Sequence, residues 1–207
     1  MFDAFGPQYW WPGDTRLEIC IGAILTQNTN WKNAAKAIEN LKKEGMLDLY
    51  AIAGSDEKKL AEMIRSSGYY NQKTKKLKAF AKFVIEEEES FEGFDSYDTV
   101  KLRELLLSIR GIGPETADDM LLYAFDRPVF VVDAYTFRIF HRHGLLDDSA
   151  SYNEIAELFA SNLESDSKLY GEYHALIVQI GKNFCKKSKP KCESCPLFGD
   201  LKKISGQ

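Results

Sequence analysis

Three of the four cysteines lie in a short segment near the C-terminus, whereas Cys20 stands apart. Cys185, Cys192 and Cys195 follow the spacing Cys-x6-Cys-x2-Cys. Thiolates at such short spacings typically hold a metal ion or an iron–sulfur cluster, whereas disulfide frameworks use paired cysteines spread along a secreted chain. The sequence therefore predicts a metal or cluster site at this end of the chain.

A glycine-rich turn, Gly111-Ile112-Gly113-Pro114, could bind a phosphate. Both glycines permit backbone conformations closed to other residues, and Pro114 suits the first position of a new helix. Backbone amides at that helix start would point outward, with the positive end of the helix dipole behind them. The alternative is an ordinary helix end followed by a proline-started helix.

Helices must position these residues, because apolar side chains recur at helical spacing almost throughout the chain. Asp14 or Thr15 is the candidate N-cap of the first long helix. Only Pro128–Val132 resembles a strand, and it is short enough to be a buried extended connector. The sequence thus predicts an all-α fold, with helices over 15–27, 31–43, 114–125, 134–143, 152–163 and 169–182, and others following Ser55, Asn71 and Asp98.

Composition sets the broad class. The chain has 207 residues, 44% of them hydrophobic, which suits one compact unit or two packed lobes and excludes a disordered protein. No apolar run approaches the roughly 20 residues that span a bilayer, and the first residues lack the features of a signal peptide. We therefore expect a soluble cytoplasmic protein with no membrane partner.

The residues around the glycine turn resemble a known family. Leu-Leu-Ser-Ile-Arg-Gly-Ile-Gly-Pro-Glu-Thr-Ala, followed by the segment 130–138 with Asp133, is similar to the helix-hairpin-helix and Gly/Pro-Asp signature of the endonuclease III superfamily of DNA glycosylases. Gly-Tyr-Tyr-Asn-Gln-Lys at 68–73, Leu-Thr-Gln-Asn-Thr at 25–29 and the cysteines with His174 upstream resemble it too. These matches run in order over nearly the whole chain.

The resemblance implies two helical lobes with a DNA groove between them and Asp133 at its mouth. Residues 15–127 would form a six-helix lobe with the hairpin, and residues 1–14 plus 128–207 a second helical lobe ending in the cysteine-rich loop. The implied partner is double-stranded DNA with a damaged base. The protein would act as a monomer associated with the nucleoid.

The resemblance assigns catalysis to Asp133. An enzyme of this class extrudes the nucleotide from the duplex, and breaking the N-glycosidic bond builds positive charge on the sugar. A carboxylate can stabilise that charge and can orient or deprotonate the attacking water. The other interpretation of Asp133, a helix N-cap before Ala134, is compatible because a cap fixes the carboxylate.

Glu115 occupies a position that matters for strand cleavage. Family members that also cut the strand have a lysine two positions after the second hairpin glycine, here Gly113, and its amine forms a Schiff base with the sugar. A carboxylate cannot form that imine. The sequence therefore predicts a monofunctional glycosylase with weak or absent lyase activity, in which Glu115 belongs to the base pocket.

Three tryptophans indicate which damaged base the protein would bind. Trp10-Trp11-Pro12 and Trp31 resemble the 3-methyladenine DNA glycosylase III branch, in which aromatic residues at these two sites sandwich the flipped purine. Electron-rich rings favour a flat cationic base such as 3-methyladenine. Trp11 could replace Trp10 in this role, and the alternative is that all three anchor the N-terminal segment on the core.

The remaining family positions would contact DNA. Gln27 matches the polar residue that fills the gap left by the extruded nucleotide, and Tyr69 matches the intercalating position. A helix-facing polar residue and a surface tyrosine are the alternatives. Thr116 completes the DNA-binding set with Gly111 and Gly113.

The net charge of −4 excludes a wholly basic surface, yet lysines gather locally. Seven lysines and two acids lie between Lys182 and Lys203, and Asn71–Lys82 holds five lysines and no acid. These segments flank the regions expected to meet the duplex, so a locally basic surface remains compatible with DNA binding.

The cysteine site is incomplete against the family pattern, because its fourth position is Leu201. A [4Fe–4S] cluster normally needs four protein ligands. Asp200 could supply an oxygen, whereas Cys20 is expected in the other lobe. Three interpretations stay open: a cluster with a non-cysteine ligand, zinc with three thiolates, or a site without metal.

Two alternative functions share these features. An endonuclease III-like glycosylase for uracil or thymine mispairs, or for oxidised pyrimidines, would keep the architecture with a different base pocket. A non-catalytic helix-hairpin-helix DNA-binding module would keep Gly111 and Gly113 but would not need Asp133.

Overall fold

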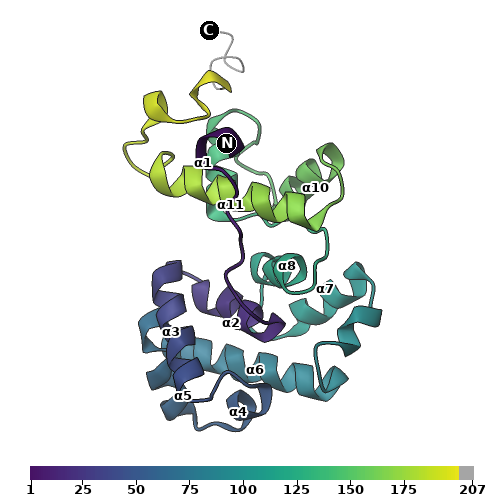
Figure 1. Ribbon diagram of the computed structural model, residues 1–207. Helices are drawn as coiled ribbons and strands as arrows, with labels where there is room; N and C mark the ends of the chain where they lie inside the picture. The colour runs from purple at the N-terminus through teal and green to yellow at the C-terminus, as the bar shows by residue number, and fades with distance from the viewer. Residues whose placement is uncertain (201–207) are drawn as a thin grey trace. The chain divides into compact units, whose positions relative to one another are not determined.

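The computed structural model describes residues 1–200, and these are built from α-helices with three short 3-10 turns (Figure 1). No strand occurs among them, which confirms the predicted all-α class. The segment 128–132 is an extended connector whose last three residues, Phe130, Val131 and Val132, are buried. Within residues 1–200, no helix combines the length and the apolar character needed to cross a bilayer.

The chain divides into two compact units. Pro12–Asp126 forms the first, which we call the hairpin unit. Within the described residues, Met1–Trp11 and Arg127–Asp200 form the second, which we call the terminal unit.

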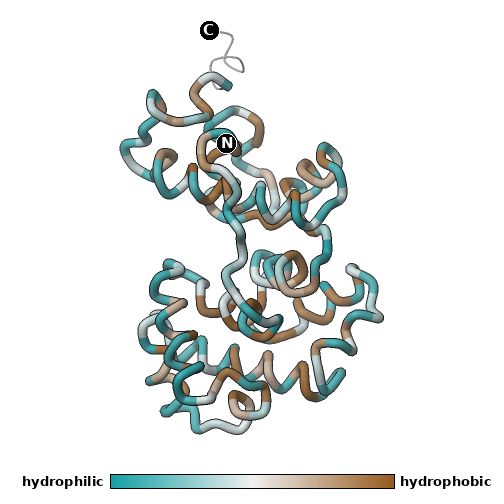
Figure 2. The backbone as a smooth tube through the Cα atoms, in the orientation of Figure 1, coloured by the Kyte–Doolittle hydropathy of each residue, from teal (hydrophilic) through white to brown (hydrophobic). Residues whose placement is uncertain are grey.

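The hairpin unit is built around α2 (Arg16–Thr26), whose residues from Cys20 to Leu25 are all buried. Figure 2 shows this helix as a hydrophobic stretch. The long helix α6 packs against α4, α5 and α2. The α-helices of this unit are α2 (Arg16–Thr26), α3 (Trp31–Lys43), α4 (Leu49–Gly54), α5 (Glu57–Met63), α6 (Tyr70–Glu88), α7 (Thr99–Ser108) and α8 (Pro114–Tyr123).

This unit has seven α-helices instead of the six expected, because the region before α6 divides in two. Asp56, and not Ser55, caps α5: its Oδ1 accepts bonds from the amides of Lys58 and Lys59, both at 3.0 Å. Ser55 instead ends α4, and its hydroxyl donates to the carbonyl of Ile52.

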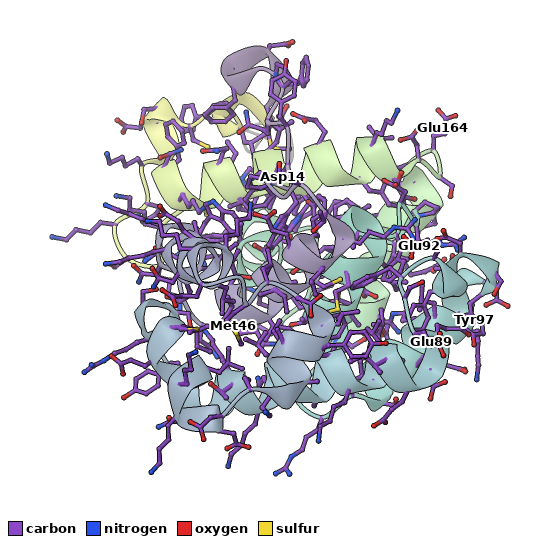
Figure 3. The ribbon with its side chains drawn as sticks, turned by 60° about the horizontal axis from the view of Figure 1, so that its bottom comes forward. Asp14, Met46, Glu89, Glu92, Tyr97 and Glu164 are labelled. Atoms are coloured by element: carbon purple, nitrogen blue, oxygen red, sulfur yellow. The ribbon has the colours of Figure 1, made fainter. Side chains whose placement is uncertain are left out.

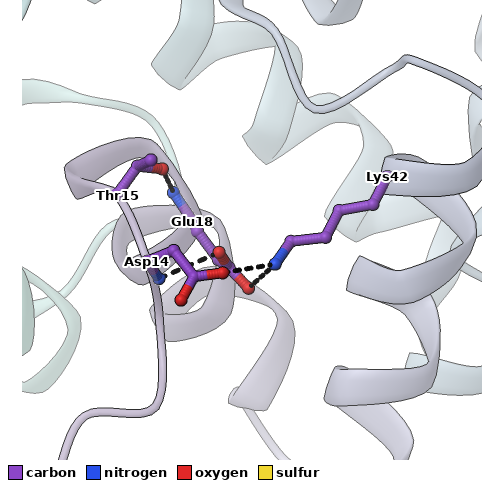
Figure 4. A network of polar contacts seen from close by, with 4 residues as sticks. All are labelled: Asp14, Thr15, Glu18 and Lys42. Atoms are coloured by element: carbon purple, nitrogen blue, oxygen red, sulfur yellow. Dashed lines mark hydrogen bonds and ion pairs between the residues drawn. The ribbon is translucent and has the colours of Figure 1, made fainter.

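Thr15 is the N-cap of α2, and Figure 4 shows the contacts around it. Its hydroxyl accepts from the amide of Glu18 at 3.2 Å. The carboxylate of Glu18 accepts in turn from the amide of Asp14 at 3.0 Å and from Lys42 Nζ at 2.7 Å. Because Lys42 belongs to the last turn of α3, this network fixes the start of α2 against the end of α3.

The acidic stretch 86–89 lies at the solvated C-terminal end of α6, which ends at Glu88. Figure 3 shows Glu89 in the same region as Glu92 and Tyr97. The hydroxyl of Tyr97 donates to the carboxylate of Glu88, which ties the end of α6 to the turn that follows it.

The terminal unit joins the two ends of the chain. Its helices α9 and α11 pack against each other, and the amide of Gln8 donates to both carboxylate oxygens of Glu172 on α11, at 2.8 and 3.1 Å. Phe130 stacks on Phe159 with ring centroids 3.8 Å apart. The helices of the terminal unit are α1 (Phe2–Phe5), α9 (Ala134–Arg142), α10 (Tyr152–Asn162) and α11 (Ser167–Asn183).

Candidate functional site

Asp133 lies where the buried connector meets α9, and it caps that helix, as the sequence predicts. Its Oδ1 accepts from the amide of Thr136 at 2.7 Å and from the hydroxyl of the same residue at 2.9 Å. The Asp133 side chain is only 12% exposed. The helix start therefore holds one carboxylate oxygen in a defined orientation.

The second carboxylate oxygen of Asp133 faces a histidine. Oδ2 lies 3.8 Å from Nε2 of His174, a side chain that is 5% exposed and belongs to α11. Burial raises the pKa of the Asp133 carboxyl, but the contact with His174 and the bonds from Thr136 outweigh burial and lower it below its ordinary value. Asp133 is thus an ionised carboxylate in a largely dry environment.

Trp10 and Lys182 lie in the same neighbourhood. The Trp10 ring is 5.6 Å from the His174 ring and 5.8 Å from the Trp11 ring, centroid to centroid. Lys182 Nζ lies 5.6 Å from the Trp10 ring centroid. Burial lowers the pKa of Lys182, and the negative charge of Asp133 opposes that shift.

The sequence did not single out Lys182 as a site residue. A signal was present, because Lys182 follows His174 by eight residues, and two helical turns place both residues on one face of α11. The terminal unit therefore brings together a carboxylate, an imidazole, an indole and an amine.

Two residues expected in the base pocket belong to the hairpin unit instead of the terminal unit. Trp31 begins α3 and is half-buried, and Glu115 is exposed in the first turn of α8. The structure thus groups Trp10 and Trp11 with Asp133, and it groups Trp31 and Glu115 with the hairpin.

The hairpin runs from α7 through residues 109–113 into α8. Gly111 has φ +92°, and a Cβ atom there would come within 2.8 Å of the Lys76 side chain. Gly113 has φ −102° and ψ 178°, and its Cβ would meet nothing within 4 Å. The prediction of a special conformation is right for Gly111 and wrong for Gly113, whose extended backbone suits any residue. Pro114 begins α8, as predicted.

Gln27 is bonded to the hairpin. Its Nε2 donates to Thr116 Oγ1 at 2.8 Å and to the Gly111 carbonyl at 3.3 Å, and its Oε1 accepts from Lys76 Nζ. Thr116 is buried, so its hydroxyl serves this internal contact. Gln27, at the end of α2, is therefore hydrogen-bonded to the hairpin.

Tyr69 is exposed at the start of α6, as expected of an intercalating side chain. It is 65% exposed and has φ +47°, directly after Gly68 with φ +67°. The expected basic surface beside it is smaller than the sequence suggests, because Lys73 is only 2% exposed. Burial and then the charge of Lys76 lower the pKa of Lys73 to about 8.

The three C-terminal cysteines line one cavity of about 250 Å³, together with Arg142, His143 and apolar side chains. Among residues 1–200, however, no three histidine, cysteine or acidic side chains are grouped closely enough to hold a metal ion. These residues do not fit the predicted metal site, and its fourth position, Leu201, lies outside the described residues. Cys20 is buried in α2 of the hairpin unit.

Arginines of α9 hold the cysteine-rich loop. Arg142 donates to Cys185 Sγ at 3.3 Å and to the carbonyls of Lys186 and Lys187 at 2.7 and 2.8 Å. Arg138 donates to the carbonyl of Cys185 at 2.8 Å. Protein contacts thus attach the start of the loop to α9.

Two curated relatives cover most of this chain. The Methanocaldococcus jannaschii protein named "Putative DNA repair glycosylase" is 51% identical over 199 residues, which are 95% of this chain and 90% of that protein. Endonuclease III of Sulfolobus acidocaldarius is 32% identical over 86% of this chain and 77% of its own length.

A solved structure resembles the fold as well. The H. pylori 3-methyladenine DNA glycosylase MagIII, bound to 1,N6-ethenoadenine, superposes with a TM-score of 0.75 at 34% identity, over 86% of this chain and 90% of that one. The model of the HhH-GPD superfamily of base excision DNA repair proteins matches residues 21–165. The chain therefore belongs to the HhH-GPD superfamily of base excision repair DNA glycosylases.

Proposed function

We propose that this protein is a monofunctional DNA glycosylase that hydrolyses the N-glycosidic bond of an extruded alkylated purine, such as 3-methyladenine. The observation that carries the proposal is the arrangement around His174, which lies 3.8 Å from the Asp133 carboxylate and 5.6 Å from the Trp10 ring. A buried anion and an aromatic face are thus available together.

Asp133 would act on the sugar. Its ionised carboxylate stabilises the positive charge that develops as the glycosidic bond breaks, and it orients the attacking water. Thr136 holds Oδ1 and His174 faces Oδ2, so the carboxylate needs little rearrangement when charge develops. A low-dielectric environment strengthens this electrostatic effect.

Trp10 would bind the base. An indole face attracts a flat cation, and 3-methyladenine in DNA carries a positive charge. Alkylation already weakens the glycosidic bond, so the leaving base needs little acid assistance. The similarity to an enzyme named 3-methyladenine DNA glycosylase supports this substrate class. Trp11 and Trp31 remain the other proposed aromatic contacts.

Glu115 supports the monofunctional assignment. It stands in the first turn of α8, two positions after Gly113, where the resemblance implies a lysine in strand-cleaving members. A carboxylate cannot attack the sugar to form an imine. Hydrolysis by water, leaving an abasic site, is then the expected outcome.

The cysteine-rich loop takes no part in this chemistry. Since Arg138 and Arg142 attach the loop to α9, we propose that these contacts organise it without a metal. Its lysines would then contribute phosphate contacts.

Base release from defined substrates tests the proposal. Duplexes containing 3-methyladenine, uracil or an oxidised pyrimidine are incubated with the protein, and the released bases are separated by chromatography. We expect release of 3-methyladenine by wild type and release slowed by a factor on the order of 100 to 1,000 in Asp133→Asn. Preferential release of uracil or an oxidised pyrimidine would assign the endonuclease III-like alternative, and binding without any release would assign a DNA-binding module.

A further inference from the structure

Lys73 is a buried lysine that the proposed chemistry does not use. Its side chain is 2% exposed, and its Nζ donates to the carbonyls of Leu25 at 2.8 Å and Ser67 at 2.7 Å. Burying an ammonium costs free energy unless its protons are bonded, so such a residue needs a specific explanation. Because the Lys73 ammonium is buried, it cannot contact a phosphate of DNA directly.

Both carbonyl partners stand next to proposed DNA contacts. Leu25 lies in the last turn of α2, where carbonyls lose their helical partners, and two residues later comes Gln27. Ser67 ends a 3-10 turn (Arg65–Ser67), and two residues later comes Tyr69. One ammonium thus connects the two segments that carry these side chains.

Lys73 also holds the turn of Tyr69 through its backbone. The amide of Lys73 donates to the Tyr69 carbonyl at 3.0 Å, while Nζ reaches past the turn to Ser67. Tyr69 has a left-handed backbone, which is unfavourable for a residue of its type and persists only when its surroundings enforce it. Lys73 thus bonds the turn at two places: its amide bonds the Tyr69 carbonyl and its ammonium bonds the Ser67 carbonyl.

We propose that Lys73 is a positioning residue for DNA distortion: its ammonium fixes the segments of Gln27 and Tyr69 relative to each other, so that both side chains can fill the duplex beside an extruded nucleotide. This inference rests on the proposed function. The lysine is mostly protonated at neutral pH, since its pKa remains at about 8.

The first test measures DNA distortion without base release. The probe is a duplex with 2-aminopurine next to a tetrahydrofuran abasic analogue, because 2-aminopurine brightens when its stacking is lost. We expect Lys73→Met, which keeps the side-chain length and removes the cation, to reduce the affinity for this duplex and the fluorescence rise roughly tenfold. Affinity for undamaged duplex should stay within about twofold, because the lysine is buried.

Lys42→Met is the matched control. Lys42 lies in the same unit, and its Nζ also connects two segments, because it pairs from α3 with Glu18 at 2.7 Å and Asp14 at 3.2 Å at the start of α2, where no DNA contact is proposed. It should lower thermal stability and leave the fluorescence response at the wild-type level. An unchanged response in folded Lys73→Met, or an equal loss in Lys42→Met, would overturn the inference.

A double-mutant cycle with Tyr69→Ala supplies a second test. If Lys73 acts through the Tyr69 turn, Lys73→Met should cost much less in the Tyr69→Ala background than in wild type, whereas additive effects contradict the inference. Lys73→Gln, which retains donor hydrogens without the charge, is measured in parallel, so the test does not depend on the folding of one variant. Because the abasic analogue has no base to release, failure of the proposed glycosylase activity would be recognised separately.

Discussion

The Oδ2 atom of Asp133 and the Nε2 atom of His174 lie 3.8 Å apart, and both side chains are almost completely buried. The carboxylate comes from the start of α9 and the imidazole from the middle of α11, so the packing of these two helices sets the distance. The contact with His174 lowers the pKa of Asp133 and so favours the carboxylate in an environment that by itself favours the neutral acid.

Asp133→Asn should strongly reduce activity with little loss of structure. Asparagine caps helices about as well as aspartate, so the bonds to Thr136 can persist while the negative charge is lost. We expect the single-turnover rate of base release to fall by a factor on the order of 100 to 1,000. Asp166→Asn, the same change at the N-cap of α11, is the matched control and should keep wild-type activity. Full activity in the Asp133 variant would remove this residue from the mechanism.

The pH dependence should report the contact between Asp133 and His174. Since the pKa of Asp133 is lowered, its carboxylate stays ionised above about pH 3.9, the ordinary value of the group. The stability that it contributes is present above that value and is lost as the pH falls through the folded pKa. In His174→Gln the contact that lowers the pKa of Asp133 is lost, so burial should raise that pKa.

We therefore expect the acid limb of the pH–rate profile to move upward in His174→Gln by at least about one pH unit. The measurement is the single-turnover rate between pH 4 and 8. The reverse movement, or none, would show that His174 does not control the ionisation of Asp133.

The two hairpin glycines should respond differently to substitution by alanine. At Gly111 the positive φ is unfavourable for alanine and the new Cβ would collide with Lys76, so Gly111→Ala should lower stability by about 1–3 kcal/mol and weaken DNA binding several-fold. At Gly113 the extended backbone and open space should make alanine nearly neutral for folding. Thermal unfolding and DNA titration compare the pair, and equal destabilisation would contradict the described turn.

Strand cleavage should be absent or weak. The wild-type protein should convert its substrate into abasic DNA that breaks only after alkali, and borohydride should trap no covalent complex. Trapping by the wild type would mean that another amine reaches the sugar. Lys182, whose Nζ lies over the Trp10 ring, would then be the first residue to test, as Lys182→Met.

The cysteine-rich loop should depend on Arg142 more than on metal. Loss of three bonds in Arg142→Ala should accelerate trypsin cleavage at the loop lysines, whereas Arg65→Ala, an exposed arginine of the hairpin unit, should leave cleavage unchanged. Treatment with chelators should have no comparable effect. Stoichiometric iron and sulfide, or zinc, in purified protein would instead assign a metal to this loop.

Local chemistry made much of the fold predictable from sequence. Thr15, Asp98 and Asp133 each cap a helix by accepting a hydrogen bond from the amide three residues later. Both partners of each bond are therefore visible in one short stretch of sequence. Ser55 shows the limit of this reasoning: two neighbouring residues can both cap, and the chain uses Asp56, whose Oδ1 accepts from two amides. The helix boundaries there depend on a competition between adjacent side chains.

The contacts of the candidate sites depend on packing between distant segments, and sequence patterns do not record those. Gln27 bonds Gly111 and Thr116, which are 84 and 89 residues away. Lys73 resembled part of a basic surface because Lys75 and Lys76 follow it closely in the sequence, yet the packing of α6 on α2 buries it. Family motifs located Asp133, whereas its proximity to His174 and Lys182 required coordinates.

The bond between Gln8 and Glu172 has a consequence for the order of events during synthesis. The hairpin unit is continuous in sequence, so all of it can leave the ribosome before the end of α11 has been translated. The terminal unit can form only later, since its segment Met1–Trp11 precedes the hairpin unit in the chain and its helix α11 follows that unit. A nascent or truncated chain would therefore present the hairpin to DNA without the assembled Asp133, His174 and Trp10.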